Sequence, residues 1–148
     1  MRKFKALVIS VFAAVFMSTT LFAADNADHK VAIHVDEKDP ATMNMALNNI
    51  ANIKKYYDSK GETVEIELVA YGPGLHMLRS DTSPVKDRIA AMSLEIDNLR
   101  FSACGNTHAK MSKKAGKEIE LLDEASKVPS GVVQLIALQE QGFAYVRP

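Results

Sequence analysis

Strand-like and helix-like runs alternate along the chain, and this alternation limits the choice of fold more than any other feature of the sequence. Runs typical of strands occur at residues 30–35, 64–71, 99–103, 125–128 and 143–146. Between them lie segments with helical character, at residues 40–60, 84–96, 106–115 and 131–141. Such alternation produces right-handed β-α-β crossovers, so strands lie mostly parallel and helices cover both faces of the sheet. The sequence therefore predicts a three-layer α/β/α sandwich around a mostly parallel five-stranded sheet.

Residues that start and stop helices support these boundaries. Asp39 is suited to cap the first helix, and Pro40 is suited to its first position. Asn106 or Thr107 is expected to cap the third helix, and Gly116 is expected to end it.

The first residues resemble a secretory signal peptide. A basic start is followed by an apolar run at residues 6–17 and by a plausible cleavage site after Ala23 or Ala24. The apolar run is short for a spanning helix, which favours cleavage. An uncleaved anchor is the alternative, because Leu21 or Phe22 is larger than the cleavage site prefers.

We therefore expect a signal peptide at residues 1–23, a flexible leader at 24–29 and one domain at 30–148. The expected location is the periplasm or another exported compartment, with no membrane contact after cleavage. Three of the 18 Lys and Arg precede residue 6 and all 18 Asp and Glu follow residue 23, which leaves a net charge of −3. That charge argues against a nucleic-acid partner.

Cys104 is the single cysteine of the chain, so it has no internal disulfide partner. It lies where a predicted strand turns directly into a predicted helix. Backbone N–H groups at a helix N-terminus stabilise a thiolate and lower the pKa of the thiol. We therefore expect an accessible and unusually acidic thiol; the alternative is a small, inert core residue.

Other candidate residues follow the same ends of the predicted strands, where open parallel sheets bind ligands. His76 and His108 could assist Cys104 as a base or an electrostatic partner, although single histidines in loops often serve only as hydrogen-bonding groups. The expected ligand-binding or loop positions are Gly72, Gly74, Asn106, Thr107, Ser130 and Gly131.

The sequence predicts no metal site and no cofactor, because no motif has ligand spacing or the pattern of a phosphate loop. Asn44, Asn48 and Asn52 recur at every fourth residue of the first predicted helix. Two readings stay open for this polar stripe: a solvated helix face, or a contact with another subunit or a ligand.

Four segments together resemble one protein family: YGPG at 71–74, FSACGNT at 101–107, VPSGV at 128–132 and QEQGFAYVRP at 139–148. The chain resembles the DsrE/DsrF-like sulfur-relay superfamily, and more narrowly its small, single-domain, exported branch. The resemblance implies a five-stranded α/β/α sandwich that assembles as a trimer or hexamer. It also implies that Cys104 takes the place of the cysteine that carries a persulfide in sulfur-carrying members.

Three classes of function follow from the residues and this resemblance. The first is sulfur transfer, with Cys104 as a persulfide carrier between a donor and an acceptor protein, in a sulfurtransferase or a sulfur carrier. The second is a non-catalytic oligomeric module that binds a small ligand or a partner. The third is a thiol redox sensor that is oxidised at Cys104.

Overall fold

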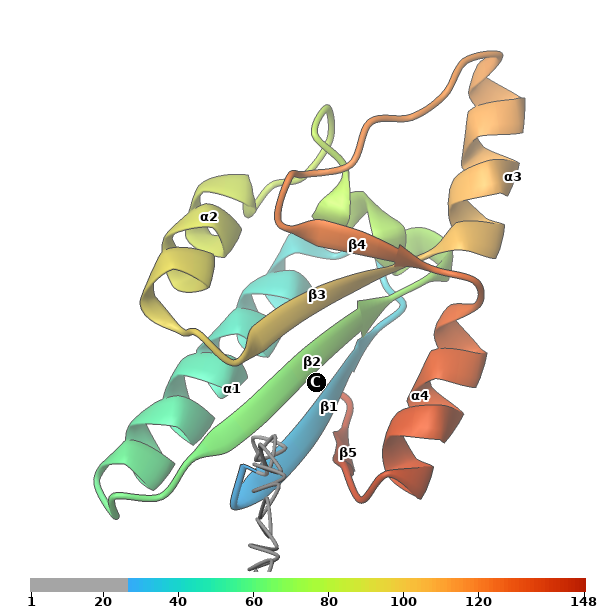
Figure 1. Cartoon of the computed structure of the whole chain (residues 1–148). Coiled ribbons are helices and arrows are strands. Elements are labelled where there is room, and N and C mark those ends of the chain that lie inside the picture. Colours follow the sequence, from blue (N-terminus) through green and yellow to red (C-terminus); the bar gives the residue numbers. More distant parts are fainter. Residues whose placement is uncertain (1–26) are drawn as a thin grey trace, which may run out of the picture.

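The structure, a computed structural model, describes residues 27–148 and contains one five-stranded sheet with helices on both faces (Figure 1). The predicted signal peptide and the first half of the predicted leader, residues 24–26, lie outside the described residues. No helix within residues 27–148 is long and apolar enough to cross a membrane. The elements in chain order are β1 (His29–Val35), α1 (Pro40–Asp58), β2 (Val64–Ala70), the 3-10 helix η1 (Gly72–Leu78), α2 (Lys86–Glu95), β3 (Leu99–Cys104), α3 (Gly105–Ala115), β4 (Ala125–Val128), α4 (Gly131–Glu140) and β5 (Ala144–Val146).

All neighbouring strands pair in parallel, in the order β4-β3-β2-β1-β5. The expected α/β/α sandwich with a parallel sheet is confirmed. Because every strand runs the same way, the carboxyl ends of β1, β2 and β3 lie side by side at one edge of the sheet. That edge receives Cys104, Tyr71 and the residues that follow Val35.

The two faces of the sheet are covered unequally. One face packs against α1 and α2 through a large apolar core that includes Ile33, Leu68 and Phe101. The opposite face packs against α4 through a small cluster, in which Leu135 and Leu138 contact the sheet. The helix α4 therefore packs on the sheet through a smaller apolar cluster than α1 and α2 do, and Gln134 adds a polar contact to Glu67 of β2.

The helix α1 begins where the sequence predicts, because the Asp39 carboxylate accepts a hydrogen bond from the Thr42 N–H at 3.1 Å. Pro40 occupies the first helical position. Its apolar stripe, which packs against the sheet, consists of Met43, Ala46, Leu47 and Ile50.

Three boundaries differ from the sequence-based expectation. The strand β1 begins at His29, because Asp28 and Thr63 exchange hydrogen bonds that extend the pairing of β1 with β2. The glycine-rich segment after β2 forms the 3-10 helix η1 instead of a simple turn. The helix α2 starts later than expected, because the Ser83 hydroxyl donates to the Met77 carbonyl oxygen at 2.6 Å and holds the preceding turn against η1.

Close packing explains why Gly74 is a glycine. A Cβ atom at this position would lie 2.2 Å from the backbone oxygen of Val35. Any larger residue would therefore push η1 away from the end of β1. Gly74 therefore has a packing role that keeps η1 at the carboxyl edge, and its expected part in ligand binding stays a prediction.

The large core carries most of the apolar stabilisation, and Phe101 is one of its largest fully buried side chains. We predict that Phe101→Ala lowers the free energy of unfolding by about 3–5 kcal/mol, because it removes a buried ring and leaves a cavity. Denaturant unfolding measures this change. Leu94→Ala is the matched control: Leu94 is 86% exposed, so the change should stay within about 0.5 kcal/mol. Equal effects of the two substitutions would contradict this assignment of the core.

Candidate functional site

Cys104 ends β3 and serves as the N-cap of α3. Its sulfur accepts a hydrogen bond from the Thr107 N–H at 3.5 Å, and Gly105 is the first helical residue. The expectation that Asn106 or Thr107 caps this helix is therefore wrong. The sulfur itself occupies the capping position, because the backbone of Cys104 is extended and presents its side chain to the first turn.

A second helix begins at the same thiol. The first residue of α4, Gly131, lies so close that an added Cβ atom would be 3.1 Å from Cys104 Cβ and 2.9 Å from two side-chain atoms of Tyr71. Ser130 stands at the N-cap position of α4, but its side chain makes no capping hydrogen bond. The N-terminus of α4 therefore faces the sulfur without a polar side-chain cap of its own.

Burial raises the pKa of the Cys104 thiol, yet hydrogen bonds to the sulfur outweigh burial and hold this pKa below its ordinary value. The donors are the Thr107 hydroxyl and the backbone N–H groups of Gly131, Thr107 and Asn106. Each stabilises the thiolate more than the thiol. Hydrogen-bond donors from two separate helices, α3 and α4, thus lower the pKa of Cys104, as expected from the sequence.

The Thr107 hydroxyl is oriented by the segment after β2. Gly72 N–H donates to Thr107 Oγ1 at 3.0 Å, so the hydroxyl hydrogen stays available for the sulfur. Gly72 adopts a left-handed backbone conformation with φ of 51°, which favours glycine. The conformation of Gly72 thus aims its N–H at the residue that hydrogen-bonds to Cys104.

The expected accessibility of Cys104 is wrong for this structure, in which the residue is 5% exposed. The first turn of α3 and the start of α4 close over the sulfur from two sides, because both helices begin at it. Small reagents can react with an acidic thiol that is enclosed in this way. A large partner reaches it only if the start of a helix moves.

The two histidines expected to assist Cys104 hydrogen-bond elsewhere. His108 Nε2 lies 2.7 Å from the carbonyl oxygen of Ile119 and connects α3 to the segment before β4. His76 Nδ1 lies 2.8 Å from Thr82 Oγ1, and burial followed by the charges of Lys38 and Arg79 lowers its pKa. Neither histidine is among the groups that hydrogen-bond to the sulfur.

A histidine that the sequence analysis did not single out, His34, lies close to the site instead. His34, on β1, stacks on Tyr71 with ring centroids 4.6 Å apart, and its Nδ1 lies 2.6 Å from the Tyr145 hydroxyl. Its Nε2 is buried without a hydrogen-bond partner, 3.8 Å from an Asp36 carboxylate oxygen. Burial lowers the pKa of His34, which favours the neutral ring. The sequence could have indicated His34 as a site residue, because it lies near the carboxyl end of a predicted strand.

Tyr71 lies between this histidine and the thiol. Its ring packs on His34 on one side and closely approaches Gly131 on the other. Burial, followed by the charge of Asp36, raises the pKa of its hydroxyl, so Tyr71 is a neutral hydrogen-bonding group at physiological pH. The wall of the site away from α3 is therefore aromatic, with the charged pair of Asp36 and Arg147 nearby.

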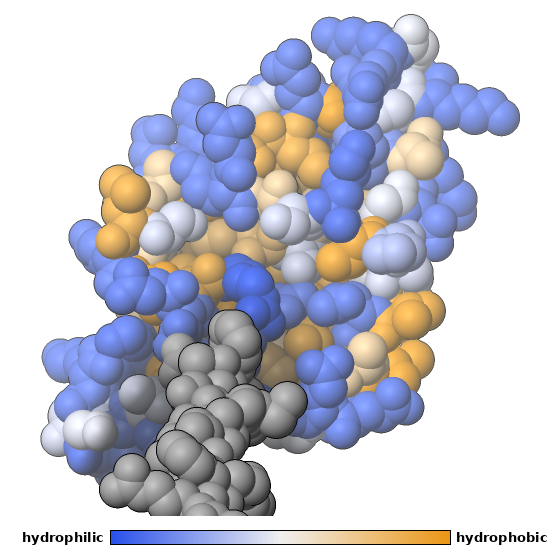
Figure 2. All heavy atoms as spheres, viewed as in Figure 1, coloured by the Kyte–Doolittle hydropathy of each residue, from blue (hydrophilic) through white to orange (hydrophobic). Residues whose placement is uncertain are grey.

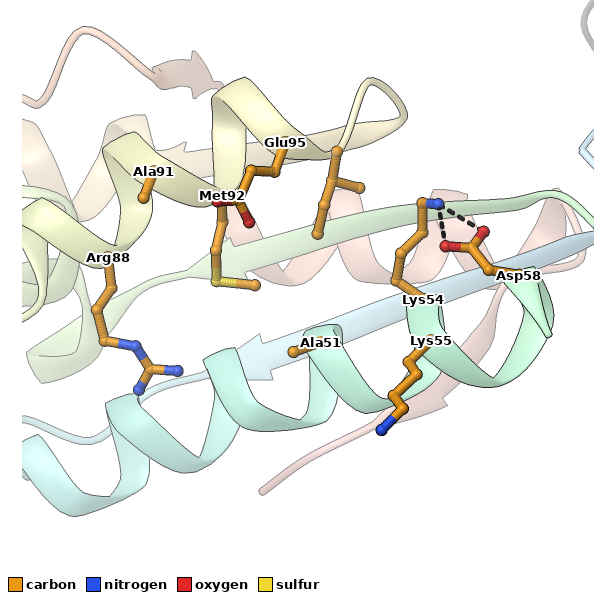
Figure 3. Close-up of a pocket in the computed structure, with 9 residues that line it drawn as sticks. Ala51, Lys54, Lys55, Asp58, Arg88, Ala91, Met92 and Glu95 are labelled. Atoms are coloured by element: carbon orange, nitrogen blue, oxygen red, sulfur yellow. Dashed lines mark hydrogen bonds and ion pairs between the residues drawn. The ribbon is translucent and has the colours of Figure 1, made fainter.

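A groove of about 470 Å³ between α1 and α2 lies apart from this site (Figure 3). Its floor contains Ala51, Ala91 and Met92, and its rim carries charged side chains such as Lys54, which pairs with Asp58. None of the lining residues comes from the carboxyl edge of the sheet. The groove therefore gives no ligand pocket to Cys104.

Within residues 27–148, no group of three or more His, Cys, Asp or Glu side chains is arranged to hold a metal ion.

Comparison with known proteins finds no matching family model and no matching curated protein. Among solved structures, the chain is similar to one described as the protein of unknown function MTH1491 from Methanobacterium thermoautotrophicum. The two chains share 32% sequence identity and a TM-score of 0.70, over 82% of this chain and 100% of the other.

The Thr107 hydroxyl provides the first test of the site. We predict that Thr107→Val raises the apparent pKa of Cys104 by about one unit, because the thiolate loses one hydrogen bond. The pH dependence of alkylation by iodoacetamide measures it: the rate should rise with pH, with its midpoint higher in the variant. Thr107→Ser keeps the hydroxyl and should retain the native midpoint. An unchanged midpoint in Thr107→Val would contradict the assigned donor.

Proposed function

The chain belongs to the same family as MTH1491, a protein described as having unknown function. We therefore propose a function from the site itself: Cys104 is a sulfur carrier that holds a persulfide. The observation that carries this proposal is the convergence of two helix N-termini on one thiol, which stabilises the thiolate. The resemblance of four segments to the DsrE/DsrF-like superfamily supports it independently.

The loading step begins with the Cys104 thiolate. It attacks the outer sulfur of a donor persulfide, R–S–SH, so that a new Cys104 S–S bond forms as the donor S–S bond breaks. The donor leaves as the thiolate R–S⁻, and Cys104 becomes Cys–S–SH. No external oxidant is needed, because the sulfane sulfur carries its oxidation level from donor to carrier.

Unloading is the reverse reaction, and the same hydrogen bonds stabilise the Cys104 thiolate as it leaves. An acceptor thiolate attacks the outer sulfur, and Cys104 departs as a thiolate. A thiol of low pKa leaves faster, so donors from α3 and α4 assist this step as well. With one cysteine in the chain, no internal thiol can displace the outer sulfur to form a disulfide. The persulfide therefore awaits an acceptor thiol from another molecule.

Burial of Cys104 narrows the choice of donor. A thiol that is 5% exposed favours a small sulfane donor, such as a low-molecular-weight persulfide or polysulfide, over a bulky disulfide. Reaction with a protein donor would require the donor to present an extended persulfide side chain.

Intact mass spectrometry tests the proposal directly, because one cysteine makes the assignment unambiguous. We predict that polysulfide adds about 32 Da to the protein, the mass of one sulfur atom, and that dithiothreitol removes it. Cys104→Ser is the control and should gain no mass. Peroxide also oxidises methionines, so a gain of about 16 Da would favour a redox sensor only where it follows peroxide alone and is missing from Cys104→Ser. No adduct that depends on Cys104 under either condition would favour a non-catalytic binding module.

A homo-oligomer, as a trimer or hexamer, is part of the same proposal. Asn44 and Asn48 give it no support, because their side-chain oxygens accept hydrogen bonds from Arg88 of the same chain. The outer face of α4 supports it better: Val132, Val133 and Ile136 are each more than half exposed, and Figure 2 shows apolar surface where α4 lies in Figure 1.

Assembly is checked by light scattering at micromolar concentration. We predict a mass of about three or six chains, and a shift toward the single chain in Ile136→Asp, because a charge opposes burial of this helix face. Leu94→Asp is the matched control, since Leu94 is an exposed apolar residue on α2. A native protein with the mass of one chain would contradict the oligomer. Equal disruption by both substitutions would contradict the role of α4.

A further inference from the structure

A buried carboxylate lies in the middle of the sheet, on the face that α4 covers. Glu67 of β2 is 2% exposed. Its Oε1 accepts hydrogen bonds from Ser102 Oγ and Gln134 Nε2, each at 2.7 Å. Its Oε2 accepts from Arg100 at 3.2 and 3.3 Å. Glu67 is thus fully partnered, by two residues of β3 and one of α4.

Stability alone does not explain this arrangement. Removing a carboxylate from water is costly, and well-packed apolar residues often replace buried ionic groups without loss of stability. The same face of the sheet already uses apolar residues nearby, with Val69 two residues further along β2 in contact with the α4 cluster. A directional hydrogen bond provides something that apolar packing does not, which is a fixed position for its donor.

Gln134, which donates to Glu67 from α4, lies one helical turn after Gly131, the residue next to the thiol. Gln134 follows Gly131 by three residues on the same helix, and Gly131 supplies a backbone N–H to the Cys104 sulfur. On β3, Ser102 lies two residues before Cys104 and therefore faces the same side of the sheet. Glu67 accordingly bridges the strand that carries the thiol and the helix that covers it.

Apart from the packing of Gly131 against Tyr71 and Cys104, few contacts hold the first turn of α4. The helix lacks a side-chain cap, and its buried apolar residues Leu135 and Leu138 lie beyond Gln134. The residues of the first turn that point outward, Val132 and Val133, are exposed. The Gln134 amide is thus the polar anchor nearest to Gly131.

From these contacts we propose that the hydrogen bond from Gln134 to Glu67 is a positioning interaction that keeps the first turn of α4 against β3, so that Gly131 N–H donates to the Cys104 sulfur. This inference deepens the proposed function, on which it rests for its biological meaning. It assigns Glu67 and Gln134 to control of thiol reactivity, although neither touches the sulfur.

The test uses Gln134→Leu, which removes the amide donor and keeps a helix-forming side chain of similar size. The apparent pKa of Cys104, from the pH dependence of iodoacetamide alkylation in the folded protein, should rise. The thiolate population at a given pH below that midpoint should fall about tenfold, as expected when a charged group loses one hydrogen bond. Gln134→Ala removes the same donor without added bulk and should behave alike, which guards against a single variant that folds poorly.

Arg100→Lys is the matched control. It keeps the positive charge but alters the contacts on Glu67 Oε2, which do not involve α4. The alkylation midpoint of this variant should equal that of the native protein. An equal shift in Arg100→Lys would overturn the inference, because it would indicate a general effect of the charge network.

Denaturant unfolding separates positioning from a purely structural role. If the Gln134 variants lose stability while the folded protein keeps its native alkylation midpoint, the inference is overturned. Sulfur transfer is read independently, by mass spectrometry of the native protein with polysulfide. A raised midpoint in Gln134→Leu together with no persulfide on native Cys104 would support the positioning role and refute the sulfur carrier.

Discussion

The contact between the start of α4 and the ends of β2 and β3 determines much of the arrangement at the carboxyl edge. Gly131 fits against Tyr71 and Cys104 with no space for a side chain. That approach brings a second helix N-terminus to a sulfur that already caps α3. The thiolate gains donors from both helices, and the helices gain an acceptor that Ser130 does not provide. Helix capping and thiol activation are therefore the same interaction at this site.

Burial and acidity act in opposite directions on Cys104, and the hydrogen bonds prevail. A thiol enclosed by apolar groups alone would be inert, because desolvation disfavours the thiolate. Here the enclosing helix starts also supply N–H donors to the sulfur, so the helices that restrict access also stabilise the thiolate. This combination agrees with the sulfur carrier proposed above, because burial limits the access of bulky reagents to the Cys104 sulfur.

The local signals in the sequence predicted the elements well where the chain itself determines them. Asp39 and Pro40 begin α1, and Gly116 ends α3 with φ of 69°, because capping and left-handed turns depend on neighbouring residues. The 3-10 helix η1 was missed, because its apolar residues Leu75 and Met77 follow no period that a short segment can display. The start of α2 was misplaced for a different reason: it depends on the hydrogen bond from the Ser83 hydroxyl to the Met77 carbonyl oxygen, a contact that exists only once η1 has formed.

The sequence by itself determined the parallel α/β/α architecture and the place of Cys104 between a strand and a helix, because alternating periodicity and a single cysteine before a helical segment can be read from the order of the residues. The tertiary structure alone decided which groups surround the sulfur. His34 and Tyr71 meet near the site from β1 and β2, while His76 and His108 face Thr82 and Ile119. Glu67 joins residues 33 to 67 positions away in the chain. The physical reason is that hydrogen bonds require direction and contact, which only the packing of parallel strands and helices supplies.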